Sequence, residues 1–106
     1  MENKNIEPII NSTLKSVEHL QLLCEHHYGD IYSYEQLKDS FNGLRQSLGQ
    51  IKNPDPDEAD IKGHMARAYC HTGDILMQLL NEEDSVCLLA RLLSKKITMI
   101  GDLITA

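Results

Sequence analysis

The sequence of 106 residues contains no tryptophan and only one phenylalanine. Its core must therefore consist mainly of leucine, isoleucine, valine and methionine, and such an aliphatic core suits packed helices better than a β-sandwich. Hydrophobic residues make up 42% of the chain and charged residues 25%, proportions that are typical of globular proteins and that argue against disorder or a fibrous repeat. We expect one folded all-α domain over residues 1–106.

Long hydrophobic runs are also missing. A bilayer-spanning helix needs about 20 apolar residues in succession, and no segment of the chain meets that requirement. The first five residues, Met-Glu-Asn-Lys-Asn, are polar and do not resemble the apolar region of a signal peptide. These absences predict a cytoplasmic protein with no membrane partner.

Cysteine is scarce, and its pattern is uninformative about metals or disulfides. Cys24, Cys70 and Cys87 are an odd number of residues at spacings that match neither a disulfide framework nor a zinc motif. Each falls on or beside an apolar helical stripe. We therefore expect all of them to be buried, reduced thiols that pack as small hydrophobic residues.

Positive charge is in short supply. The chain has 10 Lys and Arg residues against 16 Asp and Glu residues, which gives a formal net charge of −6. A nucleic acid would be repelled by this field, so we predict no nucleic-acid partner. The acidic residues are concentrated in segment 54–84. Arg91, Lys95 and Lys96 form a small basic group near the C-terminus, which we interpret as a solvated helix face.

Apolar residues recur every three or four positions in four segments, as amphipathic helices require. We predict helices near residues 5–27, 34–52, 56–80 and 82–104, the third of them capped by Asp55. Because the connections are short, neighbouring helices must be antiparallel, so the predicted fold is an antiparallel up-down-up-down four-helix bundle. Several of the interior glycines could mark close approaches between helices.

The second predicted helix has the strictest apolar pattern. Its members, spaced like the seam of a coiled coil, are Tyr34, Leu37, Phe41, Leu44, Leu48 and Ile51. A chain that folds alone would bury this seam in its own core, which is the interpretation we favour. The same seam could also pair with a second copy, so the sequence predicts either a monomer or a homodimer.

Histidines and cysteines form a candidate ligand site. The Glu-x-x-His pairs of carboxylate di-iron bundles are absent, and only Cys24 and His27 have the spacing of a zinc-binding pair. We therefore predict no metal and no cofactor. The alternative is a bundle that binds a metal or small ligand where two helices converge, through His19, Cys24, His26, His27, His64 and His71.

Arg67 and His71 are one helical turn apart on the third predicted helix. Catalysis needs a nucleophile, a base and an orienting group that converge on one pocket, and the sequence shows no such set. There is no glycine-rich phosphate loop after a strand either. We interpret the pair as part of a polar helix face and predict no catalytic residues, so the protein is not expected to be an enzyme.

The first interhelical turn is unusually rich in aromatic residues, and tyrosines are common anchors at protein interfaces. In the predicted bundle, the acidic start of the fourth helix lies at the same end. The resulting aromatic-turn patch consists of Tyr28, Asp30, Ile31, Tyr32, Glu82, Glu83 and Asp84. An equally consistent interpretation is that the aromatic residues close the end of the core.

These features favour a non-catalytic protein-binding module that binds a basic protein through the aromatic-turn patch. A small acidic inhibitor of a basic protein, of the immunity-protein or antitoxin kind, would have this character. A secretion chaperone or a regulatory adaptor would have it as well, so the sequence alone leaves these three roles open.

Overall fold

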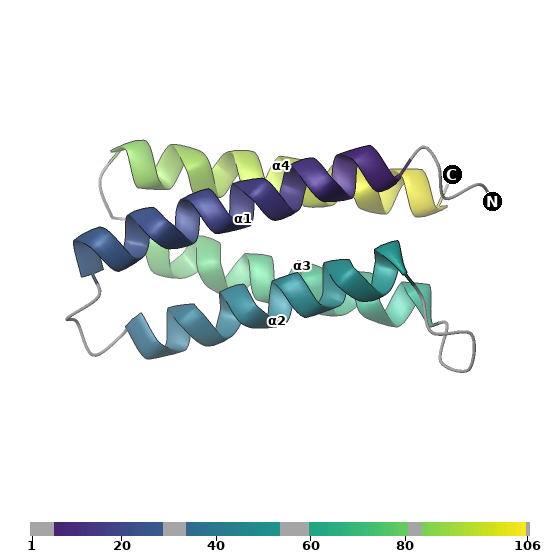
Figure 1. Cartoon of the computed structure of the whole chain (residues 1–106), viewed down its shortest axis with the longest axis horizontal. Helices are drawn as coiled ribbons and strands as arrows, with labels where there is room; N and C mark the ends of the chain where they lie inside the picture. Colours follow the sequence, from purple (N-terminus) through teal and green to yellow (C-terminus); the bar gives the residue numbers. More distant parts are fainter. Residues whose placement is uncertain (1–5, 29–33, 54–59, 81–83, 106) are drawn as a thin grey trace.

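The computed structural model describes residues 6–28, 34–53, 60–80 and 84–105. They form the helices α1 (Glu7–Tyr28), α2 (Tyr34–Lys52), α3 (Ile61–Leu79) and α4 (Asp84–Thr105). The chain reverses direction from each helix to the next (Figure 1). The predicted all-α four-helix bundle is therefore confirmed for the described residues.

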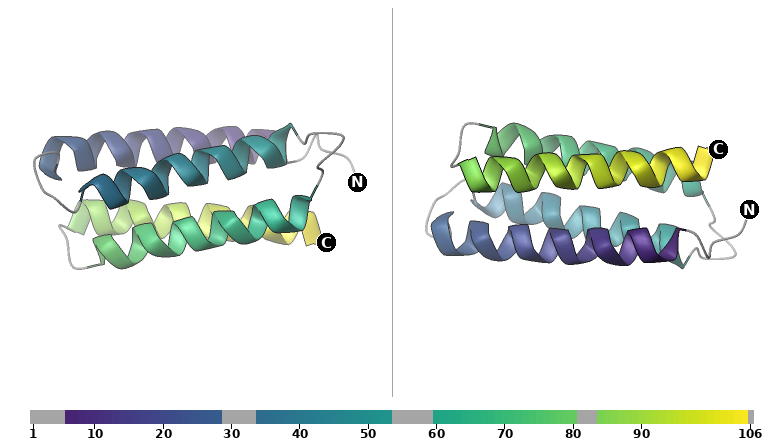
Figure 2. Two further views of the ribbon diagram at one scale, coloured as in Figure 1. Left: turned by 90° about the horizontal axis from the view of Figure 1, so that it is seen from below. Right: turned by 90° about the horizontal axis from the view of Figure 1, so that it is seen from above.

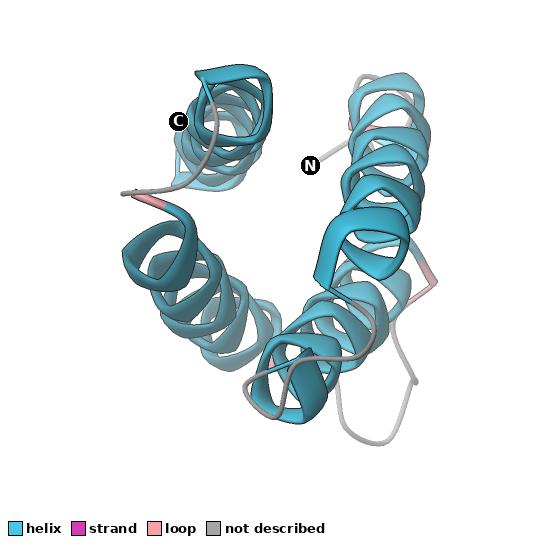
Figure 3. Cartoon of the chain, turned by 90° about the vertical axis from the view of Figure 1, so that its left-hand side faces the viewer, coloured by secondary structure: helices cyan, strands magenta, loops and turns pink. Residues whose placement is uncertain are grey.

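The helices follow one another around a central core. Each packs against its neighbours in the sequence, and α4 returns to contact α1. The end-on view shows this order, and the two side views show all four axes running along the length of the molecule (Figures 2 and 3). The bundle measures 42 × 24 × 18 Å. A helix as long as α1, at a rise of 1.5 Å per residue, is roughly 33 Å long, so helix length sets the long dimension.

The core is aliphatic around a single aromatic ring. Phe41 is fully buried, and the α2 seam from Leu37 to Ile51 lies inside the chain's own core. This burial agrees with the interpretation that the seam is intramolecular. The largest fully buried side chains come from all four helices: Phe41, Ile10, Leu20, Leu44, Leu48, Ile75, Leu79, Leu93, Ile97, Ile100, Val17 and Val86.

Two threonines are buried among these apolar side chains. The Thr13 hydroxyl donates to the carbonyl oxygen of Ile9 at 2.7 Å, and the Thr72 hydroxyl donates to that of Ala68 at the same distance. Both hydroxyls thus find acceptors one turn earlier in their own helix, which avoids the cost of burying an unpaired polar group.

The start of α3 differs from the prediction. The helix begins at Ile61 and its N-cap is Asp60, whose carboxylate accepts a hydrogen bond from the backbone N–H of Gly63 at 3.0 Å. The predicted start at residue 56, with Asp55 as the cap, is wrong. Asp60 directly precedes the apolar stripe of α3, so a helix capped there already covers the face that is buried. Segment 54–59 lies outside the described residues.

Two interior glycines mark close contacts between helices. A Cβ atom at Gly43 of α2 would overlap the imidazole ring of His71 on α3, and one at Gly101 of α4 would overlap the hydroxyl of Tyr69 on α3. At Gly49 and Gly73, by contrast, a Cβ atom would meet no other atom within 4 Å. Gly43 and Gly101 are therefore among the glycines that mark a close approach, and Gly49 and Gly73 are not.

This difference predicts opposite results for two matched substitutions. Gly73→Ala should raise the free energy of unfolding by up to about 1 kcal/mol, because alanine favours a helix and the site has room. Gly101→Ala should give no such gain, because the new methyl group must displace Tyr69. Urea denaturation of both variants would measure this. Equal stabilisation by the two substitutions would contradict the close contact at Gly101.

Candidate binding surfaces

The helix ends that border the aromatic-turn patch lie together. Tyr28 is the last residue of α1 and Asp84 is the first of α4, and both ends are at the same end of the bundle (Figure 1). The structure does not describe the side chains of these two residues. The rest of the patch, namely Asp30, Ile31, Tyr32, Glu82 and Glu83, lies outside the described residues. The patch therefore stays a prediction.

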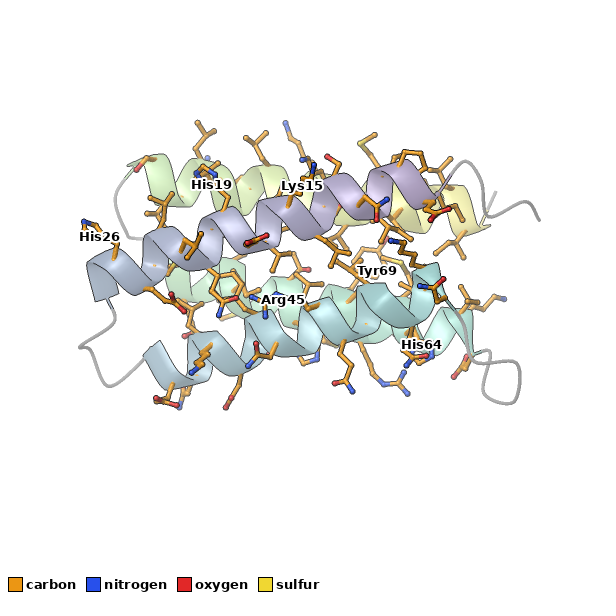
Figure 4. All side chains as sticks on the ribbon, viewed as in Figure 1. Lys15, His19, His26, Arg45, His64 and Tyr69 are labelled. Carbon is orange, nitrogen blue, oxygen red and sulfur yellow. The ribbon has the colours of Figure 1, made fainter. Side chains whose placement is uncertain are left out.

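The described histidines belong to two helices that do not adjoin. His19 and His26 are exposed on α1, whereas His64 and His71 are half-buried on α3. Figure 4 shows His19 and His26 on α1 and His64 on a different helix, α3. Within the described residues, no three His, Cys, Asp or Glu side chains are placed to hold a metal ion. The convergence that the metal-binding alternative requires is thus not found there; the side chain of His27 is not described.

The cysteines differ in burial, which corrects the prediction that all are buried. Cys24 is buried, Cys87 is half-buried and Cys70 is exposed. Cys70 lies midway between Ala68 and Thr72, which are both buried. With 3.6 residues per turn, the residue between two core positions four apart must point away from the core.

A groove of about 590 Å³ runs between α1 and α4. It was not predicted, because its two walls come from opposite ends of the chain. None of the described residues that line it is acidic, although the chain carries a net charge of −6. The lining residues are Pro8, Asn11, Ser12, Lys15, Ser16 and His19 from α1, and Leu89, Leu92 and Lys96 from α4.

Lys96 links the two walls of this groove. Its ammonium group donates to the Ser16 hydroxyl at 2.7 Å and to the Ser12 hydroxyl at 3.0 Å. Both acceptors are neutral, so these bonds position the ammonium without compensating its charge. Figure 4 shows Lys15 and His19 on the side of α1 that borders α4. The groove therefore presents cations, hydroxyls and apolar carbon together.

Apolar side chains continue this surface along α4. Leu88, Leu92 and Met99 are 58%, 43% and 51% exposed, and their spacing places them on one stripe of the helix. Beside them lie the cations of the groove. We call this surface the α1–α4 face and define it by Lys15, His19, Leu88, Leu92, Lys96 and Met99.

A second, more polar pocket of about 290 Å³ lies between α2 and α3. It contains the Arg67 and His71 pair that the sequence suggested as a polar helix face, together with His64. Arg67 Nη1 lies 3.3 Å from His64 Nδ1. The residues that line this pocket are Gly43, Gln46, Ser47 and Gln50 from α2, and His64, Arg67 and His71 from α3.

Comparison with known proteins identifies no relative. The chain matches no family model, no curated protein and no solved structure. Among the helices of the described residues, none combines the length and the hydrophobicity that crossing a membrane would require.

The unequal burial of the cysteines predicts their reactivity with a thiol reagent. Cys70 should react rapidly in the folded protein, whereas Cys24 should react only when the chain unfolds, because access controls thiol exchange. Reaction with Ellman's reagent, followed by absorbance, would separate the fast phase of exposed Cys70 from the later reactions of half-buried Cys87 and buried Cys24. Cys70→Ser should remove the fast phase, and its persistence in that variant would contradict its assignment to Cys70.

Proposed function

We propose that this protein is a non-catalytic protein-binding module whose α1–α4 face docks an amphipathic helix that carries acidic residues. One observation supports this proposal above the others. In a strongly acidic chain, a groove with no acidic residue among its described lining runs beside a stripe of exposed leucine and methionine. Helix-in-groove recognition uses such a combination, with apolar anchors for affinity and charges for orientation.

Local charge favours an acidic partner at this face in spite of the net charge. At physiological salt the Debye length is about 8 Å, so charges on the far side of the bundle are largely screened. Lys15 and Lys96, in contrast, lie within direct reach of a helix seated in the groove. Carboxylates on that helix would compensate a charge that Ser12 and Ser16 leave uncompensated.

A second copy of the chain fits this face less well. In a two-fold symmetric contact the same surface patch meets itself, so the patch that carries Lys15 and Lys96 would face a second patch with the same two positive charges. Like charges at close range oppose such a contact. The occupant we propose is therefore a different protein, whose docking segment supplies the opposite charge.

The proposal keeps the functional class that the sequence favours and adds a surface with the opposite charge preference. An inhibitor, a secretion chaperone and a regulatory adaptor all act by holding a partner in a complex, so the α1–α4 face is compatible with each. Binding of a basic protein at the aromatic-turn patch stays a separate prediction.

Designed peptides of defined sequence would test the docking proposal. The first is a helix-forming peptide with leucine on one face and glutamate flanking it; the second replaces each glutamate with lysine; the third scrambles the first. Isothermal titration calorimetry and fluorescence anisotropy should show that the glutamate peptide binds and that the other two bind at least about tenfold more weakly. Preference for the lysine peptide would contradict the proposed partner chemistry.

Matched substitutions would locate the binding surface. Leu92→Ser and Lys96→Glu should each weaken binding of the glutamate peptide by about tenfold or more, as expected for an anchor and for a central charge. Two control variants lie on α3: Met77→Ser replaces an exposed apolar side chain and Lys62→Glu reverses an exposed charge. Neither position lines the groove or belongs to the stripe. These controls should bind as the original chain does. Equal losses in the two pairs would show that the peptide does not dock on the α1–α4 face, and sedimentation analysis would reveal any self-association there.

A further inference from the structure

The pocket between α2 and α3 concentrates potential positive charge in a second place. His64, Arg67 and His71 line its α3 wall, and among the described residues no acidic side chain lines it. The guanidinium of Arg67 is always protonated in proteins. The α2 wall adds the amides of Gln46 and Gln50 and the hydroxyl of Ser47, so the pocket is rich in hydrogen-bond donors.

The contact between Arg67 and His64 sets the tautomer of the imidazole ring when that ring is neutral. Arginine has donors and no acceptor, so in this contact His64 Nδ1 is the acceptor at 3.3 Å. The proton of the neutral ring is then on Nε2. This atom is buried and has no hydrogen-bond partner within the described part of the chain. A buried donor without an acceptor is unfavourable, so a rotation of the ring that brought Nε2–H to an acceptor would be favoured.

The glycine of α2 gives His71 its place in the same pocket. A side chain at position 43 would overlap the imidazole ring. A glycine inside a helix is less favourable than alanine, so the sequence gives up helix stability at the point where His71 packs. His64 and His71 are two helical turns apart on α3, and Arg67 lies between them on the same wall of the pocket.

We infer that the α2–α3 pocket binds a tetrahedral oxyanion, either inorganic phosphate or the phosphate group of a small monoester. Arg67 supplies the permanent charge and a planar pair of donors that suits phosphate oxygens. His64, His71, Gln46 and Gln50 line the remainder of the pocket and supply further side-chain nitrogen atoms. A volume of about 290 Å³ leaves room for a phosphate group with a small substituent. This inference does not depend on the α1–α4 face, which lies on the other pair of helices.

Titration of the whole chain with inorganic phosphate, and separately with phenyl phosphate, would test the inference. Phosphorus NMR and calorimetry should detect saturable binding. Nitrogen NMR of the histidine rings should show His64 as the Nε2–H tautomer, and its Nε2 resonance should shift as the anion is added. Tighter binding of phenyl phosphate would identify a monoester as the ligand, and equal binding would identify the free anion; either result supports the oxyanion site.

Variants would assign the binding to this pocket. Arg67→Gln should weaken phosphate binding by at least about tenfold, whereas Lys62→Gln, which changes an exposed charge outside the pocket, should leave it unaltered. Gly43→Ala provides a second variant that favours helix formation while displacing His71, and it should also weaken binding. Circular dichroism would check that each variant folds.

Absence of saturable binding to the original chain would overturn the inference. It would be overturned equally by binding that Arg67→Gln and Gly43→Ala leave unchanged, because the anion would then lie elsewhere on the protein. If Arg67→Gln fails to fold, the folded Gly43→Ala variant and the His64 resonance still decide between the two outcomes.

Discussion

Burial of four aliphatic stripes around Phe41 is the constraint on which the rest of the molecule depends. Each leucine, isoleucine or valine that is fully buried contributes about 1.5–3 kcal/mol relative to leaving it in water. Because the α2 seam is occupied inside the chain, α2 is held between α1 and α3. The core residues of α4 then bring that helix back against α1. The ring of helices follows from satisfying all four stripes at once.

This ring decides which polar residues meet. The flank of a helix just outside its buried stripe faces a neighbouring helix, so each pair of neighbours forms a groove from two separate segments. Between α1 and α4 this brings Lys96 to Ser12 and Ser16, which lie 84 and 80 residues earlier in the sequence. Between α2 and α3 it places His64, Arg67 and His71 opposite a wall of amides and a hydroxyl. In the part of the chain that the structure describes, neither groove is lined by an acidic residue.

The two grooves differ in chemistry because different types of residue line them, although each lies between two neighbouring helices. The α1–α4 groove has leucines beside its cations and continues into an exposed apolar stripe, which suits the side of another helix. The α2–α3 pocket is smaller, and its lining is dominated by nitrogen and oxygen donors, which suits a compact anion. Gly43 adds a local reason for the second case, since only the absence of a side chain lets His71 pack against α2.

The existence of four helices, the buried stripe of each and their antiparallel arrangement could be predicted from the sequence. The 3.6-residue period and the short connections are local properties, so they can be recognised within one segment of the chain. The sequence predicted the α2 boundaries correctly. It predicted the wrong start for α3, because more than one aspartate that could cap a helix precedes the apolar stripe of α3. The exposure of Cys70 could also have been read from its position between Ala68 and Thr72. Packing between helices set the meeting of Lys96 with Ser12 and Ser16 and the burial of His64 Nε2. It also made Gly43 and Gly101 contact points and left Gly49 and Gly73 without contacts. Those features depend on which helix flanks face each other, and periodicity within one segment carries no information about the segment packed against it.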